Sequence, residues 1–230
     1  MKYYAVITAG GVGKRMKASV PKQFLDLDGK PILLRAIELF TTLDFPVEIV
    51  LVLPPAHIAI WKDYYNRNNL MFPHTIVQGG LTRFHSVRAA LEVIPDGAVV
   101  AVHDGVRPIV PQELISRLFK YPIGDNCAGV IPVMPVVESM RKKVFSEDGA
   151  LSGTTPVIRE DYMLVQTPQV FDSTRLKKAY KKPYSPSFTD DASVMESSGY
   201  SFDTVEGSKF NLKITTRDDL KFARILLAAD

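Results

Sequence analysis

Cysteine is nearly absent from this chain of 230 residues. The single cysteine, Cys127, excludes an internal disulfide and any metal site built from several cysteines. The histidines are also few, and the four of them, His57, His74, His85 and His103, show no spacing typical of metal ligands. The sequence therefore predicts neither a disulfide-stapled fold nor a zinc centre, and the lone thiol agrees with a reducing cytoplasm.

Long apolar runs and a strong net charge are missing as well. No stretch approaches the roughly 18 apolar residues that span a bilayer. The N-terminus lacks the basic and apolar regions of a signal peptide. The net charge of +3 is small and of mixed sign, so bulk electrostatics gives no support to nucleic-acid binding. We expect a cytoplasmic protein with no membrane and no nucleic-acid partner.

Short apolar runs alternate along the chain with amphipathic segments. The runs predict strands at Tyr3–Thr8, Val47–Leu53, Thr75–Val77, Ala98–Val102 and Ala128–Val133. The segments between them predict helices near Ile32–Phe40, Ala56–Asn66, Arg83–Ile94 and Gln112–Phe119. This alternation indicates an α/β fold: one three-layer αβα domain over residues 1–230, with a mostly parallel Rossmann-like sheet and a ligand crevice at the carboxyl ends of the strands.

One segment, about residues 136–159, interrupts the alternation. It is polar, carries Arg141-Lys142-Lys143, and has a turn signal at Asp148-Gly149 between two runs that can be extended. We expect a protruding β-hairpin arm. A two-stranded ribbon is only marginally stable alone, so the arm either packs on a second subunit or is a mobile surface hairpin, and the residues by themselves leave both open.

A glycine-rich loop follows the first expected strand. It reads Thr8-Ala9-Gly10-Gly11-Val12-Gly13-Lys14-Arg15 and is continued by Pro21-Lys22-Gln23. Glycines at a strand-to-helix turn let backbone amides face a polyphosphate. The Walker pattern is excluded because Arg15 follows Lys14, and the dinucleotide fingerprint fails because Met16 replaces its third glycine. The loop predicts a phosphate cradle that carries its own cations.

Further motifs occur in register with this loop. They are Gly79-Gly80-x-x-Arg83-x-x-Ser86-Val87, His103-Asp104-Gly105-Val106-Arg107-Pro108, Gln166-Thr167-Pro168-Gln169, Thr189-Asp190-Asp191-Ala192-Ser193, Val205-Glu206-Gly207 and Asn211-Leu212-Lys213-Ile214-Thr215. Together they resemble the 2-C-methyl-D-erythritol 4-phosphate cytidylyltransferase family of the non-mevalonate isoprenoid pathway, over nearly the whole chain. The resemblance implies transfer of CMP from CTP to that sugar-alcohol phosphate, with release of pyrophosphate.

The resemblance also implies roles for individual residues. Arg15 and Lys22 match cations that stabilise the transition state, Lys213, expected on a late strand, matches the lysine that positions the acceptor, and Arg159 matches an arm arginine contributed by the neighbouring subunit. CTP would be held by Ala9, Gly10, Gly11, Gly13, Gly80, Arg83 and Ser86. The acceptor would meet Asp104, Arg107, Ser139 and Thr189, with Ser139 standing where the family often has threonine.

Cofactor and assembly follow from the same resemblance. Mg2+ is implied, bound mainly through the phosphates of CTP, because a bare triphosphate would repel an anionic nucleophile. A homodimer is implied by the arm. Thr82, Thr216 and Thr189 are expected to cap the helices that follow them, the second of these in a capping box.

Three alternatives compete with this interpretation. A ribitol-5-phosphate cytidylyltransferase shares CTP and most motifs; the sequences Thr189-Asp190-Asp191-Ala192-Ser193 and Val205-Glu206-Gly207-Ser208 favour the methylerythritol acceptor. A non-catalytic nucleotide-binding regulator would be expected to lack Arg15, Lys22 or Lys213, and all three are present. A dehydrogenase is disfavoured by the failed dinucleotide fingerprint.

Overall fold

The computed structural model describes residues 1–11 and 20–228. A mixed sheet forms the centre, with strands in the order β10-β7-β11-β6-β1-β4-β5 and with β12 paired to β7. These strands are β1 (Tyr3–Thr8), β4 (Glu48–Leu53), β5 (His74–Gln78), β6 (Val99–Asp104), β7 (Gly129–Pro135), β10 (Met163–Val165), β11 (Gln169–Asp172) and β12 (Asp203–Glu206).

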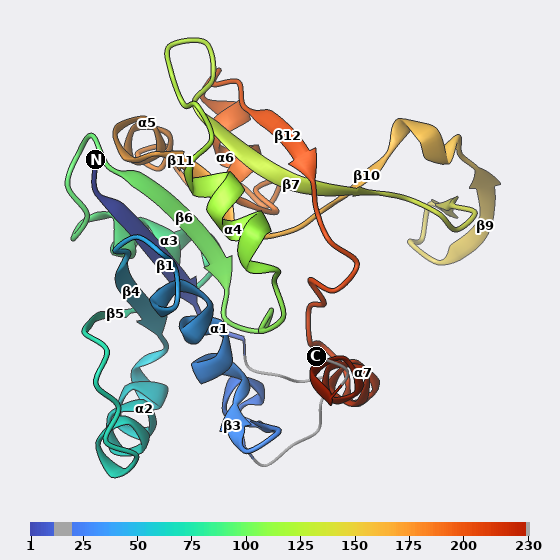
Figure 1. Ribbon diagram of the computed structural model, residues 1–230. Helices are drawn as coiled ribbons and strands as arrows, with labels where there is room; N and C mark the ends of the chain where they lie inside the picture. The colour runs from blue at the N-terminus through green and yellow to red at the C-terminus, as the bar shows by residue number, and fades with distance from the viewer. Residues whose placement is uncertain (12–19, 229–230) are drawn as a thin grey trace.

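The half of the sheet that carries the glycine-rich loop is parallel. Strand β1 pairs in parallel with both β4 and β6, and β4 pairs in parallel with β5. Beyond β6 the sheet becomes mixed, because β11 runs antiparallel to β6 and β7, and β10 runs antiparallel to β7. The four parallel strands therefore bring their carboxyl ends to one edge, where the loops that follow them meet (Figure 1).

Helices cover both faces of this sheet, as the apolar periodicity predicts. One hydrophobic cluster joins the sheet to α3 (Arg83–Leu91), α5 (Ser173–Ala179) and α6 (Asp191–Ser197). A second cluster joins the opposite face to α1 (Ile32–Thr41), α2 (Pro55–Arg67) and α4 (Gln112–Phe119). The expected three-layer αβα arrangement is thereby confirmed. None of the helices within residues 1–11 and 20–228 has the length and apolar character needed to cross a membrane.

A smaller cluster attaches the C-terminal part of the chain. Helix α7 (Arg217–Ala228) buries Ala223 beside Leu27 and Ile32, next to the small hairpin of β2 (Asp26–Leu27) and β3 (Lys30–Pro31). The capping box expected at Thr216 is present: its hydroxyl accepts from the Asp219 amide at 3.2 Å, and the Asp219 carboxylate accepts from the Thr216 amide at 2.8 Å. This cap fixes the residue at which α7 begins.

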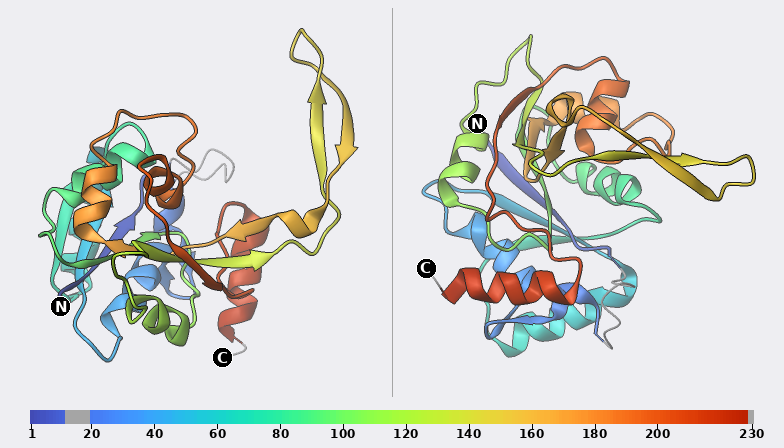
Figure 2. Two further views of the ribbon diagram at one scale, coloured as in Figure 1. Left: turned by 90° about the horizontal axis from the view of Figure 1, so that it is seen from above. Right: turned by 90° about the vertical axis from the view of Figure 1, so that its right-hand side faces the viewer.

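The arm is a separate two-stranded ribbon. Strands β8 (Arg141–Phe145) and β9 (Leu151–Pro156) pair antiparallel, with Gly149 at φ 80° in the turn. Figure 2 shows the ribbon standing away from the body of the molecule, and every residue of both strands is exposed. The hairpin expected at about residues 136–159 is therefore confirmed. The description of the whole segment as polar is incomplete, because the apolar side chains of Val144, Phe145 and Leu151 are exposed on the ribbon.

Candidate active site

A pocket of about 460 Å3 lies at the carboxyl ends of the parallel strands. We call it the nucleotide pocket, after the ligand that the family resemblance implies for the residues lining it. Residues that directly follow β1, β4 and β5, and the last residue of β6, all contribute to its wall. The lining residues are Thr8, Ala9, Gly10, Gly11, Lys22, Gln23, Pro54, Pro55, Gly79, Gly80, Leu81, Thr82, Arg83, Ser86, Asp104, Val106 and Lys213.

Most residues predicted to hold the nucleotide line this one pocket. Ala9, Gly10, Gly11, Gly80, Arg83 and Ser86 all do so, and Lys22 and Lys213 join them. Gly13 and Arg15, which the sequence also assigns to the site, lie outside the described residues. The sequence reasoning gave no role to Pro54, Pro55 or Val106. Pro54 and Pro55 directly follow a predicted strand, which is the signal that could have found them.

The Gly79-Gly80 loop is shaped by close backbone contacts. A Cβ atom on Gly80 would lie 2.5 Å from the Cβ atom of His85, so a larger residue does not fit there. The Gly80 amide donates to the Ser86 hydroxyl at 3.1 Å, and that hydroxyl donates to the Thr82 carbonyl at 3.0 Å. Thr82 is the N-cap of α3, as predicted. Ser86 therefore holds the loop that forms one wall of the pocket.

Lys22 approaches from the opposite wall. It begins a 3-10 turn, η2 (Lys22–Phe24), and its Nζ lies 3.5 Å from the Ile214 carbonyl. The neighbouring Gln23 is buried and donates to the Ala9 carbonyl at 2.9 Å and to His57 Nδ1 at 2.8 Å. The Gln23 side chain thus ties the Lys22 turn to the residue that follows β1.

A second pocket, of about 240 Å3, adjoins the first. We call it the acceptor pocket, because Asp104, Arg107 and Thr189, for which the family resemblance implies contact with the acceptor, line it. It is lined by Arg83, Asp104, Arg107, Val165, Gln166, Thr167, Gln169, Thr189, Asp190 and Lys213. Three charged residues, Arg83, Asp104 and Lys213, line both pockets. The two pockets therefore meet at a shared group of charges.

Asp104 is the centre of that group. Its carboxylate lies 2.9 Å from Lys213 Nζ, 3.2 Å from Arg107 Nε and 3.6 Å from Arg83 Nε. Burial by itself raises the pKa of Asp104, but Arg83, Lys213 and Arg107 outweigh burial and hold the pKa well below its usual range. Asp104 is therefore a carboxylate at neutral pH. Because Arg83 also pairs with the buried Asp191 at 2.6 Å, three cations face two carboxylates here, and the positive charge that remains in excess suits a phosphorylated ligand.

The turn that presents Asp104 and Arg107 is held by a buried chain of hydrogen bonds. The Asp104 amide donates to the Thr167 hydroxyl at 3.1 Å, which lies 3.1 Å from His103 Nδ1, and His103 Nε2 lies 2.9 Å from the Arg107 carbonyl. Burial lowers the pKa of His103 to about 4, so the imidazole is neutral. A neutral ring donates from one nitrogen and accepts at the other, which completes the chain.

Two local expectations are wrong. Lys213 was expected on a strand, but residues 211–215 are irregular. Isolated hydrogen bonds hold this segment in place of a strand ladder; for example, the Ile214 amide donates to the Val106 carbonyl at 2.9 Å. Thr189 was expected to cap the next helix, but Asp190 is the N-cap of α6, in a reciprocal capping box with Ser193. Thr189 is exposed at the rim of the acceptor pocket.

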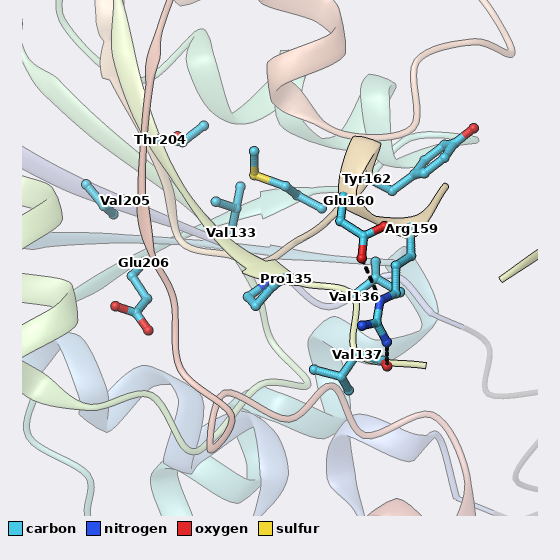
Figure 3. A pocket seen from close by; sticks show the side chains of 11 residues that line it. Val133, Pro135, Val136, Val137, Arg159, Glu160, Tyr162, Thr204, Val205 and Glu206 are labelled. Carbon is cyan, nitrogen blue, oxygen red and sulfur yellow. Dashed lines mark hydrogen bonds and ion pairs between the residues drawn. The ribbon is translucent and has the colours of Figure 1, made fainter. Parts of the chain in front are cut away.

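Two predicted residues of the arm do not reach either pocket of their own chain. Ser139 is exposed at the start of the arm. Arg159 lies in the turn η3 (Arg159–Asp161), pairs with Glu160 at 3.0 Å and donates to the Val137 carbonyl at 2.5 Å (Figure 3). Its surroundings form a broad hollow of about 920 Å3, which we call the arm-base groove, lined by Val133, Pro135, Val136, Val137, Arg159, Glu160, Tyr162, Met163, Thr204, Val205 and Glu206.

The fold and the two pockets define a class: an α/β protein with a cationic site for phosphorylated ligands at the carboxyl ends of parallel strands. Comparison with known proteins then identifies the family. Residues 3–229 match the model of the family 2-C-methyl-D-erythritol 4-phosphate cytidylyltransferase. The chain belongs to this family and is a cytidylyltransferase.

Individual relatives agree with this assignment. The chain is 46% identical to the enzyme of that name from Bacteroides fragilis over 223 residues, which is 97% of this chain and 98% of the relative. It is 44% identical to the one from Porphyromonas gingivalis over 229 residues, 99% of each. Among solved structures, the enzyme of that name from Francisella tularensis superimposes with a TM-score of 0.77 at 30% identity, covering 98% of this chain and 99% of that one.

Proposed function

We propose that the two pockets divide the family's reaction between them, with CTP in the nucleotide pocket and the methylerythritol phosphate in the acceptor pocket. The reaction transfers CMP from CTP to 2-C-methyl-D-erythritol 4-phosphate and yields 4-diphosphocytidyl-2-C-methylerythritol and pyrophosphate. One observation carries this division: Arg83, Asp104 and Lys213 line both pockets. A bond that joins two phosphates forms where the two sites meet.

In this scheme the protein supplies charge and orientation, and the substrate supplies the nucleophile. An acceptor phosphate oxygen, already ionised at neutral pH, attacks the α-phosphorus of CTP in line with the departing pyrophosphate. Lys22 and Lys213 stabilise the charge that accumulates on the phosphoryl oxygens, and Arg15 serves the same purpose by its match to the family. Asp104 accepts hydrogen bonds from the acceptor hydroxyls and keeps Lys213 in place at 2.9 Å.

Mg2+ enters with CTP in this proposal, bound mainly by phosphate oxygens and waters. The residues fit such a metal triphosphate better than a metal cage of the protein's own. Within the described part of the chain, no group of three or more His, Cys, Asp or Glu residues could hold a metal ion. The acid that faces both pockets, Asp104, is already engaged by three cations. Magnesium bound to the triphosphate neutralises part of its charge and favours attack by an anion.

Base selection falls to small residues on the nucleotide side. Ala9, Gly10, Gly80 and Ser86 line the nucleotide pocket with small side chains. We expect backbone groups there to contact the exocyclic amine and carbonyl of cytosine, which distinguishes CTP from UTP, and the pocket to be too narrow for a purine. The backbone at Gly80 packs against His85, which keeps this side of the pocket in place.

The arm completes the site from a second subunit in this proposal. The arm and the residues at its base expose several large apolar side chains. They are Val137, Val144, Phe145, Leu151, Ile158, Tyr162, Met163 and Leu164. Exposed apolar surface around a groove is typical of a protein interface. In a homodimer Arg159, at the base of the arm, and Ser139, at its start, would serve the acceptor pocket of the partner.

Turnover of defined acceptors tests the proposal. Purified protein with CTP and Mg2+ is given 2-C-methyl-D-erythritol 4-phosphate or ribitol 5-phosphate, and pyrophosphate release is followed. We expect fast release with the first acceptor only, and little with ATP or UTP in place of CTP. Equal rates with ribitol 5-phosphate would overturn the acceptor assignment, and equal rates with ATP or UTP would overturn the base pocket.

A further inference from the structure

Arg83 stands at the boundary between the two pockets. It is the first residue of α3, directly after the Gly79-Gly80 loop, and it lines both the nucleotide pocket and the acceptor pocket. Its side chain is 29% exposed. Among the described residues, its ion pairs and hydrogen bonds use Nε, toward Asp104, and Nη2, toward Asp191, and none uses Nη1. The Nη1 edge of the guanidinium therefore stays available to a phosphoryl oxygen.

The support of Arg83 comes from behind, through Asp191. This residue opens α6 and is fully buried. One carboxylate oxygen accepts from Arg83 Nη2 at 2.6 Å, and the other accepts from the Tyr180 hydroxyl at 2.6 Å. The amide-rich start of a helix also favours a negative charge at this position. The carboxylate thus has a donor on each oxygen, which fixes its plane.

Tyr180 is itself locked in place. It lies at the end of α5, is buried, and stacks on Phe84 with the ring centroids 4.7 Å apart and an interplanar angle of 21°. Burial, followed by the charge of Asp191, raises the pKa of Tyr180 well above its ordinary value, so the hydroxyl keeps its proton and donates. Phe84 follows Arg83 in α3, which links the tyrosine ring to the helix that carries the arginine.

The charges around Arg83 also favour the orientation in which its guanidinium points toward Asp191. Burial opposes the positive charge of Arg83, but Asp191 and Asp104 outweigh it and raise the pKa of the guanidinium further. With Asp191 removed, Asp104 would remain as the partner of Arg83, at 3.6 Å. The guanidinium would then turn toward Asp104 and compete with Lys213, which holds the same carboxylate at 2.9 Å.

We infer that Tyr180 and Asp191 are positioning residues for Arg83, which contacts the phosphoryl group as it passes from the nucleotide pocket to the acceptor. This inference rests on the division of the reaction between the two pockets proposed above. The hydroxyl of Tyr180 orients the Asp191 carboxylate, and the carboxylate orients the guanidinium. Neither residue lines the nucleotide pocket or the acceptor pocket, so both act on turnover only through Arg83.

Matched tyrosine variants give the first test. Tyr180→Phe removes the hydroxyl and keeps the stacked ring. Tyr184→Phe is the control, because Tyr184 contacts the same Phe84 ring, with the centroids 5.8 Å apart, and no hydrogen bond of its hydroxyl occurs within residues 1–11 and 20–228. We expect kcat/KM to fall roughly 10-fold in Tyr180→Phe and less than 2-fold in the control, with melting temperatures that stay close together.

A double-mutant cycle gives the second test, and a purely structural role would not pass it. Asp191→Asn is measured in the wild type and in Arg83→Met, with melting temperature and gel filtration as checks on folding. If Asp191 acts through Arg83, its substitution lowers kcat/KM at least 10-fold in the wild type and less than 2-fold in the Arg83→Met background. The same loss in both backgrounds would overturn the inference.

The outcomes separate this inference from the proposed function. Wild-type turnover with CTP and 2-C-methyl-D-erythritol 4-phosphate is measured first in the same assay, and its absence would overturn the proposed function. Normal wild-type turnover with equal rates for Tyr180→Phe and Tyr184→Phe would overturn the positioning role alone. If Arg83→Met does not fold, the tyrosine pair decides.

Discussion

Lys22 joins two segments that are distant in the sequence. Its Nζ lies 3.5 Å from the Ile214 carbonyl, and its Cε lies 3.0 Å from the position that a Cβ atom on Gly11 would occupy. The absence of a side chain at Gly11 thus lets the lysine stem lie against the cradle. This packing brings a compact, strongly hydrated point charge to the wall of the nucleotide pocket.

We expect Lys22→Ala to lower kcat on the order of 100-fold while the protein stays folded, because charge stabilisation in the transition state is lost. Lys62→Ala, an exposed lysine on α2, is the control and should leave the rate unchanged. Steady-state kinetics of pyrophosphate release measures both. A rate near that of the wild type in Lys22→Ala would remove this lysine from the mechanism.

His103 gives a prediction for pH dependence. Burial lowers its pKa from 6.5 to about 4, so the unfolded chain binds the proton more readily than the folded one. The contribution of the neutral ring is complete above pH 6.5 and is lost as the pH falls from 6.5 to 4, by about 3 kcal/mol in total. We expect His103→Gln to be less stable at pH 7.5 and to lose less stability over that range. Urea unfolding at several pH values measures this, and identical slopes would contradict it.

At the scale of elements, the sequence predicts what hydrophobic periodicity controls. The buried strands β1, β4 and β6 are near-continuous apolar runs, typical of parallel strands covered on both faces. Their positions, and that of the half-exposed edge strand β5, agree with the prediction to within two residues. Strands β10, β11 and β12 were not predicted. Strand β11 is buried between β6 and β7 but is only four residues long, too short to show a clear period. Strands β10 and β12 are three and four residues long and mostly exposed, so they carry little apolar pattern.

Site residues are predicted where a motif directly follows a strand. They are missed where a residue holds a site side chain from a distant part of the sequence. Asp104 and Gly80 follow from their place after a strand. Asp191 does not, because its partner, Arg83, is about a hundred residues away and the local sequence gives no sign of that contact. Tyr180 was missed with it, because its hydroxyl bonds Asp191. The irregular path around Lys213 was also missed: it is fixed by contacts such as Arg107 Nη1 with the Asn211 carbonyl, at 2.9 Å, and not by a ladder of backbone hydrogen bonds.

The cap of α6 gives a prediction at this scale. The Asp190 carboxylate accepts from the Ser193 amide at 2.9 Å and from Gln169 Nε2 at 2.9 Å. We expect Asp190→Ala to lower the free energy of unfolding by about 1–2 kcal/mol, the usual range for a lost N-cap, and Thr189→Ala to change it by less than about 0.5 kcal/mol. Urea unfolding distinguishes them. A larger effect for Thr189→Ala would return the cap to Thr189.

At the scale of the whole molecule, the arm is the feature that one chain does not explain. A two-stranded ribbon with exposed Phe145 and Leu151 has no partner on its own body (Figure 2), at least among the described residues. Arg159, at its base, pairs with Glu160 beside the arm-base groove and lines neither pocket of its own chain. If catalysis requires this cation, as the family resemblance implies, it acts on another subunit.

Mixed dimers test this reasoning. Arg159→Ala subunits lack the arm cation, and Lys213→Ala subunits lack a cation that lines both pockets of their own chain. If Arg159 acts in the partner's site, a dimer of one subunit of each kind has one site with both defects and one site with neither. We expect each parent to be strongly impaired and each heterodimer to recover about half of the wild-type activity, provided that its two sites work independently.

The same experiment distinguishes the opposite arrangement. If Arg159 acts in its own subunit, every site of the mixed dimer carries one defect, because the arginine is missing from one site and the lysine from the other. Activity then stays at the mean of the two parents. Differently tagged subunits, purified through both tags in sequence, ensure that only heterodimers are assayed. Heterodimers without recovery above the parents would overturn the role of Arg159 in the partner's site, and a purified protein that runs as a monomer would overturn the dimer itself.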